Sequence, residues 1–290
     1  MKPQIVTFLI KCPDQKGIIA KLTQFFYNNG FNIVSSQQYT NVIEKRFFMR
    51  IRLESDTSVL VSKSELEANF SKMAEEFQIA WKVDYGRKKQ KVAILVSHTT
   101  HNLYDLLHRH REGKLNCKVE MVVSNHEKLA PIAEMFGIPF YYKPIVNGNK
   151  QQQEADLIEL FDSHNIDLIV MARYMQILSS EFILHYNERI INIHHSFLPA
   201  FQGANPYKRA YERGVKLIGA TAHYATEDLD EGPIIEQGVE RVTHESTPTS
   251  LKAIGADIET MVLAKAVSFH LNNQIIVDAN KAIVFPETCE

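Results

Sequence analysis

Hydrophobic and polar residues follow a regular pattern over the first 85 positions, and this pattern predicts six secondary-structure elements. Apolar residues at positions 18, 19, 22, 25 and 26 recur with the 3.6-residue period of an amphipathic helix, and Asn28-Asn29-Gly30 ends it. Apolar runs with polar residues at alternate positions predict strands. The expected strands are Val6–Ile10, Phe31–Thr40, Arg46–Leu53 and Gln78–Tyr85, and the expected helices are Ile18–Phe26 and Ser64–Phe77. The order βαββαβ is that of a ferredoxin-like unit.

From residue 92 onward, short and almost uninterrupted apolar strands alternate with helices. Strands of this kind are typical of a sheet that is buried on both faces. Strands are expected at Val92–Ser97, Cys117–Ser124, Ile138–Tyr142, Asp167–Ala172, from Ile190 and at Lys216–Tyr224, and helices at Asn102–Arg111, Glu127–Phe136, Glu154–Ser163, Ser180–Tyr186, Tyr207–Arg213 and Leu251–Phe269. The alternation predicts an α/β domain with a doubly wound, mostly parallel, Rossmann-like sheet. The charged segment 86–91 is the expected linker between a domain at 1–85 and a domain at 92–290.

One strand in the second half ends in polar residues. Asn192, His194 and His195 follow directly on Ile190 and Ile191. An unpartnered buried polar group costs roughly 1–3 kcal/mol, so a strand interior has little use for these side chains. In a doubly wound sheet, ligands bind beyond the carboxyl ends of the strands. The pattern therefore suggests an active site, although a solvated strand end explains it equally well when it is taken alone.

Composition and charge argue against nucleic-acid binding and membrane binding. The 290 residues carry a formal net charge of -2, which provides no basic field for nucleic acid and no polybasic patch for a membrane. No run of about 18 apolar residues and no signal peptide is visible. Cys12, Cys117 and Cys289 lie far apart in no metal-type spacing, so we expect reduced thiols in a cytoplasmic protein.

Two further kinds of site are disfavoured. The turn after the first strand of the second half, Ser97–Asn102, contains no glycine, so it is neither a dinucleotide-binding fingerprint nor a P-loop. The pairs His98/His101, His108/His110 and His194/His195 lack the accompanying ligands of a metal motif, and we expect no metal.

The first half resembles ACT regulatory domains, through its element order, Asp14-x-x-Gly17 on the first turn and Gly30-Phe31-Asn32-Ile33 at the second strand. The resemblance implies an amino-acid effector near Asp14, Gly17 and Asn32 and a homo-oligomer, either a dimer or a tetramer. Asp14 and Gly17 equally fit a role in which they only shape the turn.

The second half is similar to the folate-dependent formyltransferase family over roughly residues 90–275. The matching motifs are Asn192-x-His194-x-Ser196-x-Leu198-Pro199, His223 and Leu229-Asp230-Glu231-Gly232-Pro233. The resemblance implies a catalytic trio of Asn192, His194 and Asp230. It also implies a folate pocket, formed by Met171, Ala172, Arg173, Tyr174, Met175, Ile177, Thr226, Glu227 and Asp228.

Several roles stay open at this stage. His195 and His223 are possible supporting residues of the trio, or histidines with a structural role. Glu227, Asp228 and Glu231 also fit a solvated turn, and Arg173 either contacts the folate glutamate tail or pairs locally. The division of acid and base roles between His194 and Asp230 is not fixed by the sequence.

The attached ACT-like half and the run His194–Phe201 resemble the deformylase branch of the family. This branch hydrolyses 10-formyltetrahydrofolate to tetrahydrofolate and formate, so the resemblance implies an enzyme of one-carbon metabolism with folate as substrate and no cofactor. The missing glycines at 97–101 agree, because an acceptor phosphate would need close backbone approach. The alternatives are formyl transfer to an amine acceptor and a non-catalytic folate and amino-acid sensor.

Overall fold

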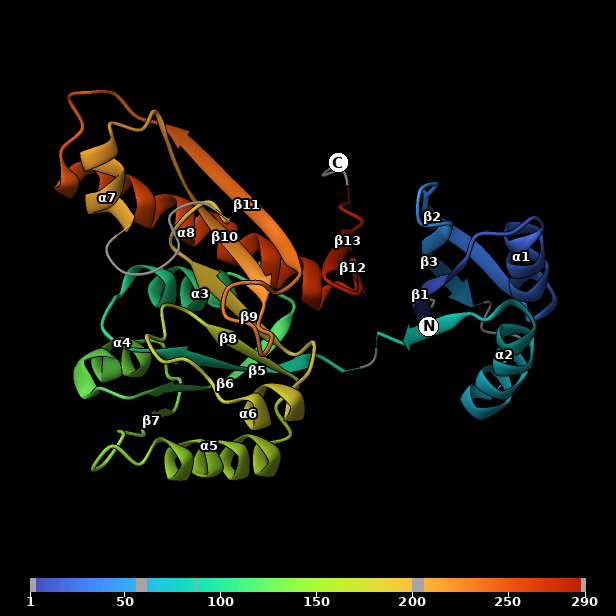
Figure 1. Ribbon diagram of the computed structural model, residues 1–290. Helices are drawn as coiled ribbons and strands as arrows, with labels where there is room; N and C mark the ends of the chain where they lie inside the picture. Colours follow the sequence, from blue (N-terminus) through green and yellow to red (C-terminus); the bar gives the residue numbers. More distant parts are fainter. Residues whose placement is uncertain (1–3, 56–61, 87, 200–205, 288–290) are drawn as a thin grey trace. The chain divides into compact units, whose positions relative to one another are not determined.

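The computed structural model describes residues 4–55, 62–86, 88–199 and 206–287, and these form two compact units (Figure 1). The first unit contains the described residues up to Lys88 together with Asn273–Ile276 and the segment from Ile283. The second unit contains Lys89–Asn272 and Val277–Ala282. The predicted division is a domain at 1–85, a linker at 86–91 and a domain at 92–290. The observed units differ from it at the C-terminal end, where Asn273–Ile276 and the segment from Ile283 group with the first unit.

The first unit is a four-stranded antiparallel sheet with two helices on one face. The strand order is β2-β3-β1-β4, with β1 at Gln4–Pro13, β2 at Phe31–Asn41, β3 at Arg46–Ser55 and β4 at Ala80–Asp84. Helices α1 (Ile18–Asn28) and α2 (Lys63–Phe77) pack on this sheet through a core in which the Phe8 ring lies 5.1 Å from Phe26 and 4.9 Å from Phe70. The predicted ferredoxin-like order is confirmed.

The second unit contains most of a nine-stranded mixed sheet in the order β12-β13-β11-β10-β9-β8-β5-β6-β7, in which β12 and β13 each have two residues in the first unit. The pairs from β9 through β8 and β5 to β7 are parallel, whereas β10 is antiparallel to both neighbours. The strands are β5 (Gln90–Val96), β6 (Cys117–Ser124), β7 (Phe140–Tyr142), β8 (Leu168–Met171), β9 (Ile190–His194), β10 (Leu217–Tyr224), β11 (Ile234–Arg241), β12 (Ile275–Asp278) and β13 (Lys281–Val284). The predicted mostly parallel α/β sheet is confirmed.

Helices cover both faces of this sheet (Figure 1). Helices α3 (His101–Arg111) and α8 (Pro248–Leu271) contact each other, and α8 packs along β9, β10 and β11. Helices α5 (Lys150–His164) and α6 (Ser180–His185) bury Leu157, Phe161 and Phe182 against the residues of β5, β6 and β8. The remaining helices are η1 (Glu127–Leu129), α4 (Ala130–Met135) and α7 (Pro206–Arg213).

Most predicted helices differ from the structure by one to three residues at an end, and for two of them the sequence explains the difference. The stretch predicted as one helix at 127–136 is a 3₁₀ turn followed by α4, because Pro131 lacks the N–H that a continuous helix needs there. Helix α5 begins four residues before its predicted start, at Lys150, where the Asn149 side chain accepts a hydrogen bond from the Gln152 N–H at 3.1 Å.

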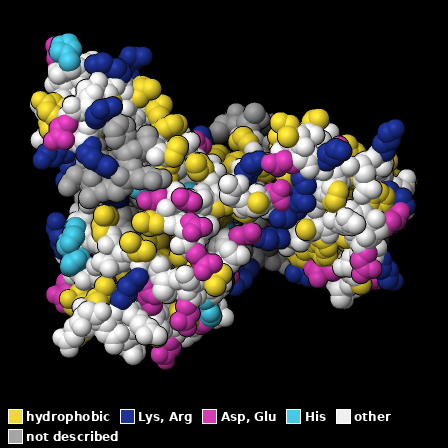
Figure 2. All heavy atoms as spheres, viewed as in Figure 1, with side chains coloured by type: hydrophobic (Ala, Val, Ile, Leu, Met, Phe, Trp, Pro, Cys, Tyr) yellow, Lys and Arg dark blue, Asp and Glu magenta, His cyan; other side chains and the backbone are white. Residues whose placement is uncertain are grey.

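The surface shows no segregation of charge on the face drawn in Figure 2, where acidic and basic side chains are interspersed. In the described part of the chain, none of the helices combines the length and the apolar character that a membrane crossing requires.

Candidate active site

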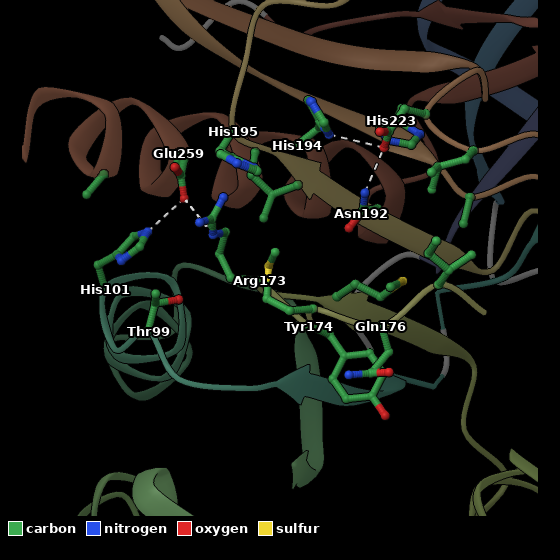
Figure 3. Close-up of a pocket in the computed structure, with 18 of the residues that line it drawn as sticks. Thr99, His101, Arg173, Tyr174, Gln176, Asn192, His194, His195, His223 and Glu259 are labelled. Atoms are coloured by element: carbon green, nitrogen blue, oxygen red, sulfur yellow. Dashed lines mark hydrogen bonds and ion pairs between the residues drawn. The ribbon is translucent and has the colours of Figure 1, made fainter. Parts of the chain in front are cut away.

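The structure brings the predicted trio together at the carboxyl end of β9. The Nδ1 atom of His194 lies 3.1 Å from Oδ1 of Asp230, and the same oxygen lies 3.7 Å from Nε2 of His223. The Asn192 amide nitrogen lies 3.2 Å from His223 Nε2 (Figure 3). Asn192, His194, His223 and Asp230 therefore form one polar cluster, in which the side chains of His194, His223 and Asp230 are 7%, 2% and 12% exposed.

The pairing of β9 with β10 sets the spacing of this cluster. The two strands run antiparallel with His223 opposite Asn192 and Thr221 opposite His194. Side chains of directly opposite residues lie on the same face of a sheet at close range, so this register places the His223 ring beside the Asn192 amide. Asn192 and His223, which lie on different strands, are thus direct cross-strand neighbours.

The loop that follows β9 is held in place by the buried hydroxyl of Thr221. This hydroxyl donates to the Ser196 carbonyl at 3.0 Å and accepts from the Leu198 N–H at 3.0 Å. The Gln237 amide of β11 adds bonds to Thr221 Oγ1 at 3.0 Å and to the Leu198 carbonyl at 3.1 Å. The polar end of β9 is therefore fixed by neighbouring strands.

Asp230 reaches the cluster from a tight turn after β10. Its backbone is left-handed, with a φ of 60°, a conformation that aspartate tolerates better than most residues. The turn is closed by hydrogen bonds from Thr226 Oγ1 and from the Glu231 N–H to the Asp228 carbonyl, at 3.0 and 3.3 Å. Gly232 lies directly against the Tyr224 carbonyl, so a side chain would not fit at this position.

The charges of the cluster favour an ionised Asp230. Burial alone would raise the pKa of the Asp230 carboxyl, but hydrogen bonds and charge from His194 and His223 outweigh it and hold this pKa far below its usual range. His223 Nδ1 donates to the Tyr224 carbonyl at 2.9 Å, and its Nε2 lies 3.2 Å from the Asn192 amide nitrogen and 3.7 Å from Asp230 Oδ1. At most one of the two Asn192 amide protons is used at this contact, so one remains for a ligand.

His194 lines the cavity and has one ring nitrogen without a hydrogen-bond partner among the described residues. Nδ1 faces Asp230, while Nε2 is buried and has no hydrogen-bond partner among the described residues. Buried polar atoms are nearly always paired with protein or water, so this atom marks a place for a bound molecule. The carboxylate at Nδ1 orients the imidazole ring, which leaves Nε2 available to a ligand.

A cavity of about 910 Å³ opens beside the cluster, a size suited to a small-molecule ligand. Predicted folate residues on its wall include Met171, Arg173, Tyr174, Met175, Ile177, Thr226 and Glu227. Two predicted residues are not on its wall: Ala172 is fully buried in the sheet, and Asp228 is exposed on the turn. Strand alternation turns Ala172 away from the face that carries Met171.

A second buried polar cluster on the same wall was not predicted from the sequence. Glu259 of α8 is 2% exposed; its Oε2 bonds to His101 Nε2 at 2.8 Å and its Oε1 accepts from the Tyr207 hydroxyl at 2.8 Å. The Arg173 Nε lies 3.6 Å from Oε2 (Figure 3). An acidic residue within the apolar helix predicted at 251–269 is the one sequence signal that points to this cluster.

His195 lies between the two clusters. Its ring centroid is 5.2 Å from that of His194 and 6.1 Å from that of Tyr207. Burial, reinforced by the positive charge of Arg173, lowers the pKa of His195 to about 4. The ring is therefore neutral at physiological pH.

The residues predicted for an effector lie in the first unit. Asp14 is exposed after β1, Gly17 precedes α1 with a φ of 91°, and Asn32 is exposed on β2. The described residues contain no group of three or more His, Cys, Asp or Glu side chains placed to hold a metal ion.

Comparisons with known proteins agree with this architecture. Residues 90–267 match the formyl transferase family model, and residues 6–68 match the ACT domain model. The formyltetrahydrofolate deformylase of Bacillus subtilis is 48% identical over 96% of this chain and 92% of its own length. The crystal structure of a formyltetrahydrofolate deformylase from Pseudomonas syringae superposes with a TM-score of 0.94 at 40% identity, over 98% of this chain and 95% of that chain.

The second half alone has wider similarity. The crystal structure of a phosphoribosylglycinamide formyltransferase from Anaplasma phagocytophilum has a TM-score of 0.63 at 30% identity, and it covers 69% of this chain and 97% of that chain. The deformylases, by contrast, match both halves in one chain. The chain belongs to the formyltetrahydrofolate deformylase family.

Proposed function

We propose that this chain hydrolyses 10-formyltetrahydrofolate to tetrahydrofolate and formate in the cavity at the end of β9. The observation that carries the proposal is His194 on the cavity wall, with Nδ1 at 3.1 Å from Asp230 and with a buried Nε2 that has no partner among the described residues. This arrangement provides a donor where a formyl oxygen becomes negatively charged and a carboxylate where a water molecule loses its proton. The family assignment supplies the substrate.

The reaction begins with attack of water on the formyl carbon, which forms a tetrahedral intermediate with a negatively charged oxygen. The free amide proton of Asn192 and the Nε2–H of His194 stabilise that oxygen, and donors of this kind are worth about 10²–10³ in rate. Asp230 orients the attacking water and accepts its proton as the new C–O bond forms, which contributes roughly 10²–10⁴. His223 holds the Asn192 amide and the Asp230 carboxylate in place. No resident cofactor or metal is needed for these steps.

The substrate's pterin is proposed to lie against the segment after β8 and the turn before Asp230. Met171, Tyr174, Met175 and Ile177 supply an apolar wall, and Thr226 and Glu227 supply polar groups from the turn. Such a mixture of apolar area with a few polar groups is typical of cofactor-sized sites.

A formate-release assay with 10-formyltetrahydrofolate as the sole organic substrate tests the hydrolysis. We expect formate and tetrahydrofolate to accumulate in equal amounts with no amine present. A transferase would instead release no formate without an amine acceptor and would form an N-formyl product when one is supplied. That is the activity named for the formyltransferases that share the second half. Tight folate binding without any turnover would identify a sensor.

We also propose that the first unit binds a small amino acid and mediates homo-oligomer formation. Asp14 and Asn32 are exposed polar residues near Gly17 on the β1–α1 turn and on β2. Strand β2 is an eleven-residue edge strand with exposed Ile33 and Val34 at 38% and 49%, and such edges pair readily with another chain.

Two measurements test this regulatory proposal. Glycine or methionine should change the rate of formate release, and Asp14→Ala with Asn32→Ala should abolish that change while basal turnover remains. Analytical ultracentrifugation should show a dimer or a tetramer. The buried free thiols of Cys12 and Cys117 suit the cytoplasmic location that we propose.

A further inference from the structure

Arg173 is a partly buried cation on the cavity wall, and two of its guanidinium nitrogens have no hydrogen-bond partner among the described residues. Its side chain is 13% exposed, and neither Nε nor Nη1 has a hydrogen-bond partner among the described residues. Its backbone is left-handed, with a φ of 65°, which costs a non-glycine residue about 1 kcal/mol. Strained backbone and unsatisfied buried donors are features that proteins retain where they bind or react with a ligand.

The carboxylate beside Arg173 does not use these donors. Glu259 Oε2 bonds to His101 and Oε1 to the Tyr207 hydroxyl, both at 2.8 Å, whereas the Arg173 Nε is 3.6 Å away. Glu259 therefore fixes the position of the guanidinium and offsets part of its charge. Figure 3 shows the Arg173 head between Glu259 and His195, turned away from Tyr174 and Gln176.

Hydrolysis creates a charge problem in this cavity. Water adds to the formyl carbon and the C–N bond breaks; one water proton ends on the amine nitrogen and the other is lost when formic acid ionises. The neutral formyl group thus becomes a formate anion beside the ionised Asp230, and like charges at close range repel. Of the lysine and arginine side chains described on the cavity wall, Lys208 and Lys252 are exposed, and Arg173 is the partly buried one.

We propose that the Arg173 guanidinium, held by Glu259, forms a subsite for a small carboxylate that receives the formate ion after C–N cleavage. The subsite rests on the proposed hydrolysis for its ligand. A guanidinium is a planar cation with several N–H donors, so a small carboxylate such as formate gains a charge-assisted contact there. The His195 ring lies between His194 and Tyr207, and because it is neutral it adds no second cation beside Arg173.

The first experiment measures product inhibition. Sodium formate is added to initial-rate assays of the whole protein and of Arg173→Lys, Arg173→Gln and Arg109→Gln. Arg109 is a matched control, because it pairs with Asp105 at 2.7 Å outside the cavity. We expect formate to inhibit the unmodified protein and Arg109→Gln equally, and Arg173→Gln to raise the inhibition constant about tenfold or more, as expected for loss of a charge-assisted hydrogen bond.

A second measurement does not require turnover. ¹³C-formate is titrated into the protein with tetrahydrofolate, and its NMR line width is followed for the unmodified protein and for Arg173→Lys, which keeps a charge next to Glu259 and so protects the fold. Broadening that is reduced in Arg173→Lys supports the subsite. This measurement separates the two proposals, because a protein that releases no formate from 10-formyltetrahydrofolate can still be tested for formate binding.

The folate glutamate tail is the other carboxylate that Arg173 could meet, and a substrate without the tail distinguishes the two. If Arg173 holds formate, Arg173→Gln changes KM to the same extent for both substrates, 10-formyltetrahydrofolate and 10-formyltetrahydropteroate. The subsite is overturned if the variant raises KM only for the glutamate-bearing substrate with formate inhibition unchanged. Absence of formate inhibition and of line broadening in the unmodified protein also overturns it.

Discussion

At the scale of single residues, Asp230 holds the arrangement together, because it contacts both His194 and His223 from one carboxylate oxygen. Asp230→Asn keeps the shape and removes the charge. We expect kcat for formate release to fall by about 10²–10⁴ while the thermal midpoint changes little. Asp257→Asn, which alters an exposed aspartate of α8, is the control and should retain full activity. Near-normal turnover in the Asp230 variant would remove this carboxylate from the mechanism.

His195 makes the fold sensitive to acid. Burial and Arg173 lower its pKa in the folded protein to about 4, whereas the ordinary histidine pKa of 6.5 applies in the unfolded chain. Well above pH 6.5 the ring is neutral in both states. As the pH falls from 6.5 toward 4, the unfolded chain takes up a proton that the folded protein does not bind, so stability declines.

The measurement is the urea midpoint at pH 7 and at pH 5. We expect His195→Asn to lose less stability over this interval than the unmodified protein, because the proton-binding difference is gone. His244→Asn, which alters an exposed histidine, should behave like the unmodified protein. An equal loss in the His195 variant and the unmodified protein would contradict the assignment.

At the scale of elements, the turn between β10 and β11 places Asp230 by close contact with the end of β10. Gly232→Ala would drive a methyl group into the Tyr224 carbonyl, so the turn must move and carry Asp230 with it. We expect a loss of both stability and kcat. Gly148→Ala, which meets nothing within 4 Å at a φ of 73°, is the control: it should cost about 1 kcal/mol from backbone strain alone and leave kcat unchanged. Unchanged kcat in Gly232→Ala would show that the turn adapts.

The elements also show what the sequence can and cannot reveal. Asn192, His194 and His223 are visible in it because polar residues at the ends of apolar strands break a strong local pattern. The Glu259 cluster is not, since its members come from α3, the segment after β8, α7 and α8, and only the packing of these elements brings His101, Arg173 and Tyr207 to one carboxylate. The motif resemblance assigns Ala172 to the pocket because the matching motif is a run of consecutive residues. In the structure, neighbouring side chains of this run point in different directions, and only some of them line the cavity.

At the scale of the whole molecule, the chain does not divide into two consecutive domains. Asn273–Ile276 and the segment from Ile283 belong to the first unit, while Val277–Ala282 belongs to the second. Within the first unit, the buried Arg50 donates to the Asn273 carbonyl at 2.8 Å and pairs with Glu287 at 3.0 Å, and Phe48 packs with Ile276 and Phe285. The sequence does not predict that these segments group with the first unit, because the apolar pattern of residues 275–284 is the same wherever they pack.

Because C-terminal segments belong to the first unit, we can predict how a chain cleaved after residue 88 behaves. A protease site inserted between Lys88 and Lys89 would separate the first 88 residues from the rest, yet the C-terminal segments of the second fragment remain part of the first unit. We expect the two fragments to co-elute in gel filtration after complete cleavage. Deletion of residues 273–290 before cleavage should let them separate, because the Arg50 and Phe48 contacts are then lost. Separation of the fragments with the C-terminal segments intact would mean that these contacts are too weak to join the fragments, and the first unit would then be complete within residues 1–88.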